Sequence, residues 1–129
     1  MSYTIDRMFE NDGFEKIVER TRKALADQGF GVLTEIDVKQ TLKKKINADI
    51  NDYLILGACN PTMAYEALKI EQRIGSMLPC NVVVRTTDDG QVEVSAIDPQ
   101  ASMQAVDNAQ LQSVAGEVKT MMQKVVENI

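Results

Sequence analysis

The chain has 129 residues, of which 44% are hydrophobic and 26% charged, and it carries a formal net charge of −5 at pH 7. This length predicts a single domain over residues 1–129 that can bury about two-thirds of its unfolded surface without a metal or a disulfide. Histidine is absent. That absence excludes Ser-His and Cys-His catalytic pairs and removes the commonest transition-metal ligand.

The charges are distributed unevenly along the chain. Residues 86–129 contain 2 of the 14 basic and 7 of the 19 acidic side chains, which leaves 12 of each in residues 1–85. Because an acidic surface repels phosphate backbones, we expect no nucleic-acid partner. No apolar run approaches the roughly 20 residues that cross a bilayer, and the N-terminal segment does not have the order of a secretion signal. We therefore expect a cytoplasmic protein with no membrane partner.

The first two predicted elements are a strand and a helix. Residues 3–9 alternate loosely between polar and apolar side chains, which predicts the strand. The helix that follows is predicted to have Asp12 as its N-cap, with Glu15 completing a capping box. Its apolar residues recur at spacings of three and four up to Leu25, and Gly29 ends it.

Residues 30–36 alternate with period two, which predicts a second strand. One face of this strand would carry Phe30, Val32, Thr34 and Ile36. Asp37 can then cap a short helix that ends at Ile46.

Residues 53–59 form an uninterrupted apolar run, which predicts a strand covered by helices on one face and by helices or a partner on the other. Asn60 and Pro61 begin a helix, with asparagine as the N-cap and proline at the first helical position. The pattern leaves open whether this helix runs on to Leu78 or breaks near Gln72.

The C-terminal part reads as a hairpin followed by helices. Residues 81–87 and 91–97 are predicted strands, and the Asp-Asp-Gly turn at 88–90 joins them. Asp-Pro at 98–99 opens a short helical stretch. A long final helix follows over 108–129, with apolar residues at spacings of four and three.

Cys59 directly precedes the predicted N-cap Asn60. At that place the partial positive charge of the helix end would lower the pKa of the thiol and attract an anion. In the alternative interpretation, Cys59 is a small apolar residue that fills the end of a strand, as cysteine often does.

Cys80 begins the next strand and is followed by Asn81. The two cysteines meet only if the connecting chain doubles back to the same edge of the sheet. Without histidine there are too few ligands for a zinc site, so we expect no metal. The two cysteines of a cytoplasmic chain are expected to be free thiols, either buried or reactive. Met103, Met121 and Met122 are more typical of core or dimer packing than of a metal-binding array.

Glu71 is a third candidate for chemistry. In a continuous helix it would lie in the middle of the apolar face, where a carboxylate must be paired, neutral or directed into a cavity. If the helix breaks near Gln72, Glu71 instead caps or pairs at a turn, with Arg73 or Arg85 as its partner. Both interpretations stay open.

The chain carries Cys-Asn-Pro at 59–61, Leu-Pro-Cys-Asn at 78–81 and Val-Ser-Ala-Ile-Asp-Pro at 94–99. With these motifs it resembles the family called domain of unknown function 302. The resemblance implies an α+β two-layer sandwich, similar in fold to the TATA-binding protein, with a curved, mainly antiparallel sheet of about five strands and helices on one side. It also suggests a homodimer. The resemblance implies no particular enzymatic reaction. It also does not imply DNA binding, because a fold does not define a function.

We therefore predict a small dimeric module that binds a small-molecule ligand or depends on a thiol, with no cofactor indicated. The predicted ligand-binding residues are Cys59, Asn60, Glu71, Cys80 and Asn81. One alternative is an enzyme that uses a Cys59 thiolate, with Glu71 as acid or base and Cys80 as a further catalytic candidate. A second alternative is a structural dimer with inert cysteines.

Overall fold

The structure is a computed structural model that describes residues 2–129. Its strands are β1 (Thr4–Phe9), β2 (Gly31–Asp37), β3 (Tyr53–Cys59), β4 (Cys80–Thr86) and β5 (Val92–Ile97). Its helices are α1 (Phe14–Asp27), α2 (Val38–Ile46), α3 (Pro61–Ile70), the 3-10 helix η1 (Gln72–Met77), α4 (Pro99–Ser102) and α5 (Ala109–Glu127). The strands form one sheet in the order β1-β5-β4-β3-β2, and every neighbouring pair is antiparallel.

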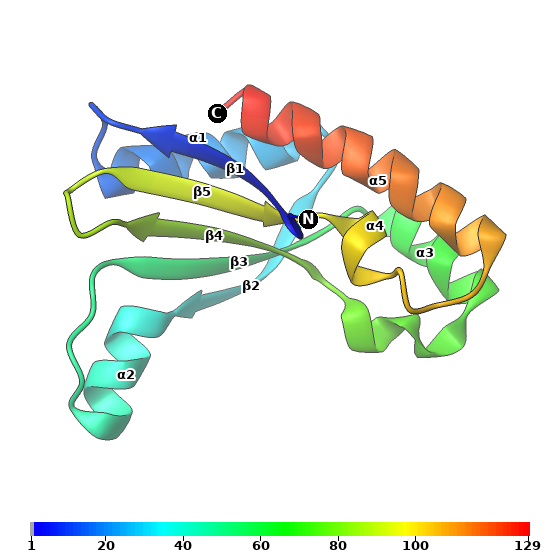
Figure 1. The fold of residues 1–129 in the computed structure, drawn as a ribbon, viewed down its shortest axis with the longest axis horizontal. Coiled ribbons are helices and arrows are strands. Elements are labelled where there is room, and N and C mark those ends of the chain that lie inside the picture. Colours follow the sequence, from blue (N-terminus) through cyan, green and yellow to red (C-terminus); the bar gives the residue numbers. More distant parts are fainter. Residues whose placement is uncertain (1) are drawn as a thin grey trace.

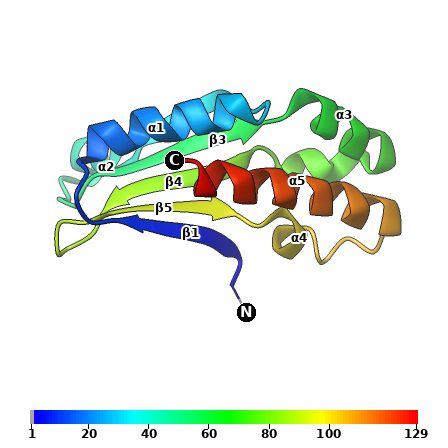
Figure 2. The ribbon, with the colours of Figure 1, turned by 90° about the horizontal axis from the view of Figure 1, so that it is seen from above.

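The sheet and the helices form two layers. Helices α1 and α5 lie side by side over one face of the sheet, whereas α2 lies beyond the ends of β2 and β3 (Figures 1 and 2). Burial alternates along the strands: Val82, Val84, Val92 and Val94 are buried under the helices, and their neighbours in sequence are half-buried or exposed. The predicted α+β class, the antiparallel sheet of five strands and the long C-terminal helix are therefore confirmed. We call the other face of the sheet the open face.

Four of the helices begin with a side-chain cap. The cap oxygen of Asn60 accepts a hydrogen bond from the Met63 amide at 3.2 Å. Asp37, Asp98 and Asn108 cap α2, α4 and α5 in the same way. These caps satisfy backbone donors that a helix end leaves unpaired, so each helix begins where the sequence predicts.

The predicted capping box of α1 is wrong. The N-cap of this helix is Gly13, and no side chain bonds to the first turn. Asp12 forms ion pairs with Lys16 and Arg20 instead, each at 3.2 Å. Its carboxylate thus compensates for two nearby positive charges.

The predicted faces of β2 are wrong beyond Val32. The pairing of β2 with β3 shifts between Val32 and Thr34, which places a β-bulge at Leu33. Because a bulge adds one residue to a strand, it transfers the following side chains to the other face. Ile36 consequently lies opposite Ile55 on the open face.

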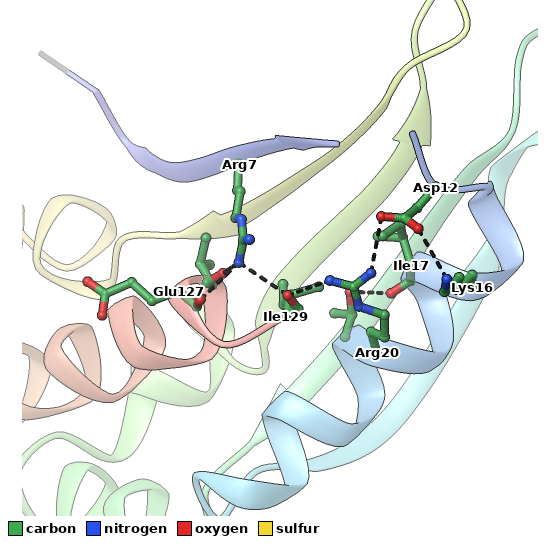
Figure 3. A network of polar contacts seen from close by, with 9 residues as sticks. Arg7, Asp12, Lys16, Ile17, Arg20, Glu127 and Ile129 are labelled. Atoms are coloured by element: carbon green, nitrogen blue, oxygen red, sulfur yellow. Dashed lines mark hydrogen bonds and ion pairs between the residues drawn. The ribbon is translucent and has the colours of Figure 1, made fainter. Parts of the chain in front are cut away.

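Two arginines hold the end of α5 against the sheet and α1 (Figure 3). Arg7 Nη1 donates to the main-chain oxygens of Glu127 and Ile129 at 2.9 and 3.2 Å, and to that of Val126 at 3.1 Å. Arg20 Nη2 donates to the oxygen of Ile129 at 2.8 Å. Positive charge at this position compensates for the negative end of the helix dipole and satisfies carbonyls that lack a partner within the helix.

Candidate functional site

The two cysteines lie at the same end of the sheet. Ala58 of β3 is paired with Cys80 of β4, so Cys59 is only one residue beyond the partner of Cys80. The chain between them leaves the sheet as α3, turns, and returns through η1 and Pro79. The condition for a shared site, that the connection doubles back, is therefore met.

The connection doubles back because α3 ends early. Glu71 has an extended backbone with φ −142° and ψ 106°, and its side chain accepts a hydrogen bond from the Arg73 amide at 3.0 Å, which caps η1. Ile74 of η1 is buried. The continuous-helix interpretation is wrong, and the capping interpretation is confirmed, although Glu71 bonds the Arg73 main chain rather than an arginine side chain.

Glu71 is not close to the cysteines. Glu71 follows the last residue of the ten-residue helix α3, and Cys59 lies just before the N-cap at its other end. The length of the helix, roughly 15 Å, therefore separates the two residues. Asn81 also points elsewhere, because its exposed side chain lines a hollow on the open face together with Arg85 and Glu93. Of the five predicted site residues, the fold brings together Cys59, Asn60 and Cys80.

These three residues line a cavity of about 30 Å³ between the ends of β3 and β4 and the helices α3 and α5. The rest of its wall is apolar and includes Ala64 and Ala67 of α3. Both polar atoms of the Asn60 side chain are hydrogen-bonded, since its oxygen caps α3 and its Nδ2 donates to Met121 Sδ at 3.7 Å. The cavity wall is therefore apolar except for sulfur and one amide group.

The two thiols differ in their surroundings. Cys80 is buried, and this burial, together with the neighbouring Cys59, raises the pKa of the Cys80 thiol to about 11. Cys59 is half-buried. At neutral pH the side chain of Cys80 is thus a protonated thiol, which is a poor nucleophile.

Sequence reasoning missed two residues of the cavity, Met63 and Met103. Met63 lies in the first turn of α3, three residues after its N-cap, and this spacing was a usable signal because it turns the side chain back toward the strand end. Met103 comes from the segment after α4, and no local pattern connects it with the cysteines.

Residues 2–129 lack two further features that would indicate a function. The described residues contain no group of three or more His, Cys, Asp or Glu side chains that could hold a metal ion. In the same part of the chain, no helix has the length and apolar character that a membrane crossing requires.

The fold and the cavity together define a small α+β domain with an open-faced antiparallel sheet and a thiol-lined recess at one sheet end. The family model described as "Domain of unknown function DUF302" matches residues 7–129, so the chain belongs to that family, as its motifs indicate. The chain is also similar to the crystal structure of the uncharacterized conserved protein DUF302 from Bacillus stearothermophilus, with 23% identity and a TM-score of 0.92. That likeness covers 99% of this chain and 98% of the other, and at this identity it shows the fold alone. No curated protein matches the chain.

Proposed function

We propose that this protein is a small, dimeric, cytoplasmic ligand-binding module whose ligand occupies the cavity beside Cys59 and Cys80. The observation that carries the proposal is the convergence of two thiols, separated by 20 residues in the chain, on one apolar recess. Ligand sites commonly combine an apolar wall with a few groups of specific chemistry. The cavity, at about 30 Å³, is far smaller than the roughly 300–1,000 Å³ of sites for drug-sized molecules. The ligand is therefore very small, or only one end of it enters.

The placement of Glu71 favours binding over the alternative of an enzyme. A Cys59 thiolate nucleophile needs a nearby group to take up or return its proton. The carboxylate of Glu71 caps η1 at the far end of α3 instead. The neighbouring Cys80 is a buried thiol whose raised pKa keeps it protonated at neutral pH, so it cannot take up the proton of Cys59.

The open face of the sheet supports the dimeric part of the proposal. It carries apolar side chains from several strands, namely Met8, Ile36, Ile55, Val83 and Ile97. Met8 and Ile36 are 43% and 47% exposed. A second copy laid on this face would remove these side chains from water, which is the dominant favourable term in association.

Ligand binding in the cavity is tested by thermal unfolding of the native protein with a library of small metabolites. A ligand that binds only the folded state raises the melting temperature. The variant Ala64→Leu places a larger side chain in the cavity wall and should abolish this rise. Ala26→Leu makes the same change on an exposed residue of α1 and is the matched control. The cavity proposal is wrong if Ala64→Leu responds to the same compounds as the wild type, or if neither a compound nor a metal ion stabilises the wild type.

The role of the thiols is tested separately with a small disulfide reagent on the native protein over about pH 5–9, a span around the value of free cysteine. Fast reaction of Cys59 with a midpoint well below that of free cysteine would support a thiol-dependent function. Absence of reaction until the protein is denatured would support the alternative with inert cysteines. The variants Cys59→Ser and Cys80→Ser assign the reacting group.

A further inference from the structure

The cavity beside Cys59 and Cys80 brings together four sulfur-bearing side chains from four separate segments. Cys59 ends β3, and Cys80 begins β4. Met63 lies in the first turn of α3, and Met103 follows α4. The whole chain has 7 methionines and 2 cysteines, so 4 of its 9 sulfur-bearing residues line one small cavity.

We propose that this cavity binds one soft, monovalent metal ion, with Cu(I) as its biological representative. The thiolates of Cys59 and Cys80 are the two anionic ligands, and the thioethers of Met63 and Met103 are neutral supporting ligands. This inference rests on the proposed function, because it names the ligand class of the same cavity.

The composition of the wall selects a soft ion over the common hard ones. Calcium and magnesium require several oxygen ligands, whereas the cavity wall contains no carboxylate and its one amide, that of Asn60, is already hydrogen-bonded. Structural zinc sites require four nitrogen, thiolate or carboxylate ligands, and residues 2–129 hold no group of three such side chains. Thiolate and thioether sulfur is the ligand set that favours Cu(I).

The size of the cavity and its charge environment agree with a single ion. A volume of about 30 Å³ exceeds the roughly 10–15 Å³ that a water-sized particle needs, so a single ion fits. Binding breaks two S–H bonds and forms two thiolate–metal bonds, and the two thioethers donate lone pairs to the ion without losing a proton. Two protons leave to solvent, the ion keeps its oxidation state, and the complex of one monovalent cation with two thiolates has a net charge of −1. Cys59 directly precedes the N-cap of α3, so the positive end of this helix compensates for that charge.

The test is a titration of the native protein, without oxygen, with Cu(I) supplied as its complex with a coloured chelator. The wild type is expected to take one ion per chain from the chelator and to gain the ultraviolet absorption of a thiolate–copper bond. Changes in groups that merely support a ligand already weaken metal binding about 10–100-fold, so Cys59→Ser and Cys80→Ser should each lower the affinity by more than about 100-fold.

The methionines are tested with variants that keep the packing. Leucine has nearly the volume of methionine but lacks sulfur, so Met63→Leu and Met103→Leu should weaken Cu(I) binding several-fold while the protein stays folded. Met8→Leu, on the open face, should bind as the wild type does. Unchanged affinity in both cavity variants overturns the four-sulfur arrangement.

The outcomes also separate this inference from the proposed function. If the wild type takes no Cu(I) from the chelator, while a metabolite raises its melting temperature and Ala64→Leu abolishes that rise, the metal proposal is overturned and the cavity proposal stands. If Cu(I) binds the wild type and a variant lacking both cysteines equally well, the metal proposal is overturned. If Cu(I) binds tightly and both Cys59→Ser and Ala64→Leu lose it, both proposals are supported.

Discussion

The ring of Pro79 packs directly on Gly57: a Cβ added at Gly57 would lie 2.8 Å from Pro79 Cγ, and it would also clash with Thr34 Oγ1. Gly57 is in β3, Thr34 is its partner in β2, and Pro79 immediately precedes β4. The bare α carbon of Gly57 therefore allows the returning chain to lie flat against the sheet beside the two cysteines.

Replacement of Gly57 by alanine is expected to destabilise the protein. The added methyl group meets Pro79 and Thr34, and overpacking of this kind costs about 1–3 kcal/mol. Urea denaturation of Gly57→Ala measures the loss. Gly75→Ala is the control, because a Cβ there has no neighbour within 4 Å. In the double variant Gly57→Ala/Thr34→Ala the loss should be smaller than the sum of the single losses, since one of the two clashes is removed. Strict additivity would contradict the proposed contact.

The buried thiol of Cys80 predicts a loss of stability at alkaline pH. The pKa of Cys80 is about 11 in the folded protein, against about 8.5 in an unfolded chain. Between these values the unfolded state has released its proton and the folded state has not, so the free energy of unfolding falls as the pH rises. The expected loss by pH 11 is about 3 kcal/mol, because the two pKa values lie about 2.5 units apart and one unit corresponds to about 1.4 kcal/mol.

This loss is measured as the difference between the wild type and Cys80→Ala in the free energy of unfolding from pH 8 to pH 11. In this difference, the contributions of the other groups that titrate between pH 8 and pH 11 cancel. Parallel profiles for the two proteins would show that Cys80 is not buried as a neutral thiol.

The arginine at the end of α5 is expected to contribute to stability. Arg7 donates to three main-chain oxygens in the last turn (Figure 3), and its guanidinium lies 4.7 Å from the centre of the Phe9 ring. Arg7→Gln removes the positive charge and should cost about 1–2 kcal/mol. Arg73→Gln, on the exposed surface of η1, should change the denaturation midpoint little. If both variants lowered the denaturation midpoint equally, the interaction of Arg7 with α5 would make no specific contribution to stability.

Dimerisation through the open face is expected to be sensitive to charge. Ile36→Glu places a carboxylate among apolar side chains of this face and should shift the protein toward the monomer in sedimentation velocity. Ile46→Glu is the matched control, because Ile46 is 69% exposed on α2, away from the sheet. A wild type that sediments as a monomer at all concentrations would refute the dimer. If both variants still form the dimer, the interface lies on a surface other than the open face.

Local signals in the sequence predicted most of the elements. The caps Asp37 and Asn60 were identified because each is a short acceptor side chain before a helical pattern, and such a cap acts within three residues. The buried face of α5 followed from spacings of three and four, with Leu111, Ala115 and Val118 among its buried residues. The prediction of the DUF302 family came from the motifs at residues 59–61, 78–81 and 94–99.

Local signals failed where another contact competed with them. Asp12 has the position and chemistry of an N-cap, but its ion pairs with Lys16 and Arg20 use the carboxylate instead. The alternation in β2 was correct as a pattern, but the bulge at Leu33 reverses the faces. Pairing with β3 decides that reversal, and no property of the β2 residues alone indicates it.

The sequence by itself determined the positions of the strands and most of the helix caps, because these depend on periodicity and on contacts within a few residues. Its motifs indicated the class of fold through the resemblance to the family. Only the tertiary structure decided the composition of the candidate site. The break at Glu71 and the antiparallel register of β3 and β4 bring Cys59 and Cys80 together, and they leave Glu71 at the far end of α3. The packing of α3 and α4 adds Met63 and Met103 to the same cavity. Such long-range neighbours are set by how whole elements pack, and this is the physical reason why the four sulfur atoms could not be grouped from the sequence alone.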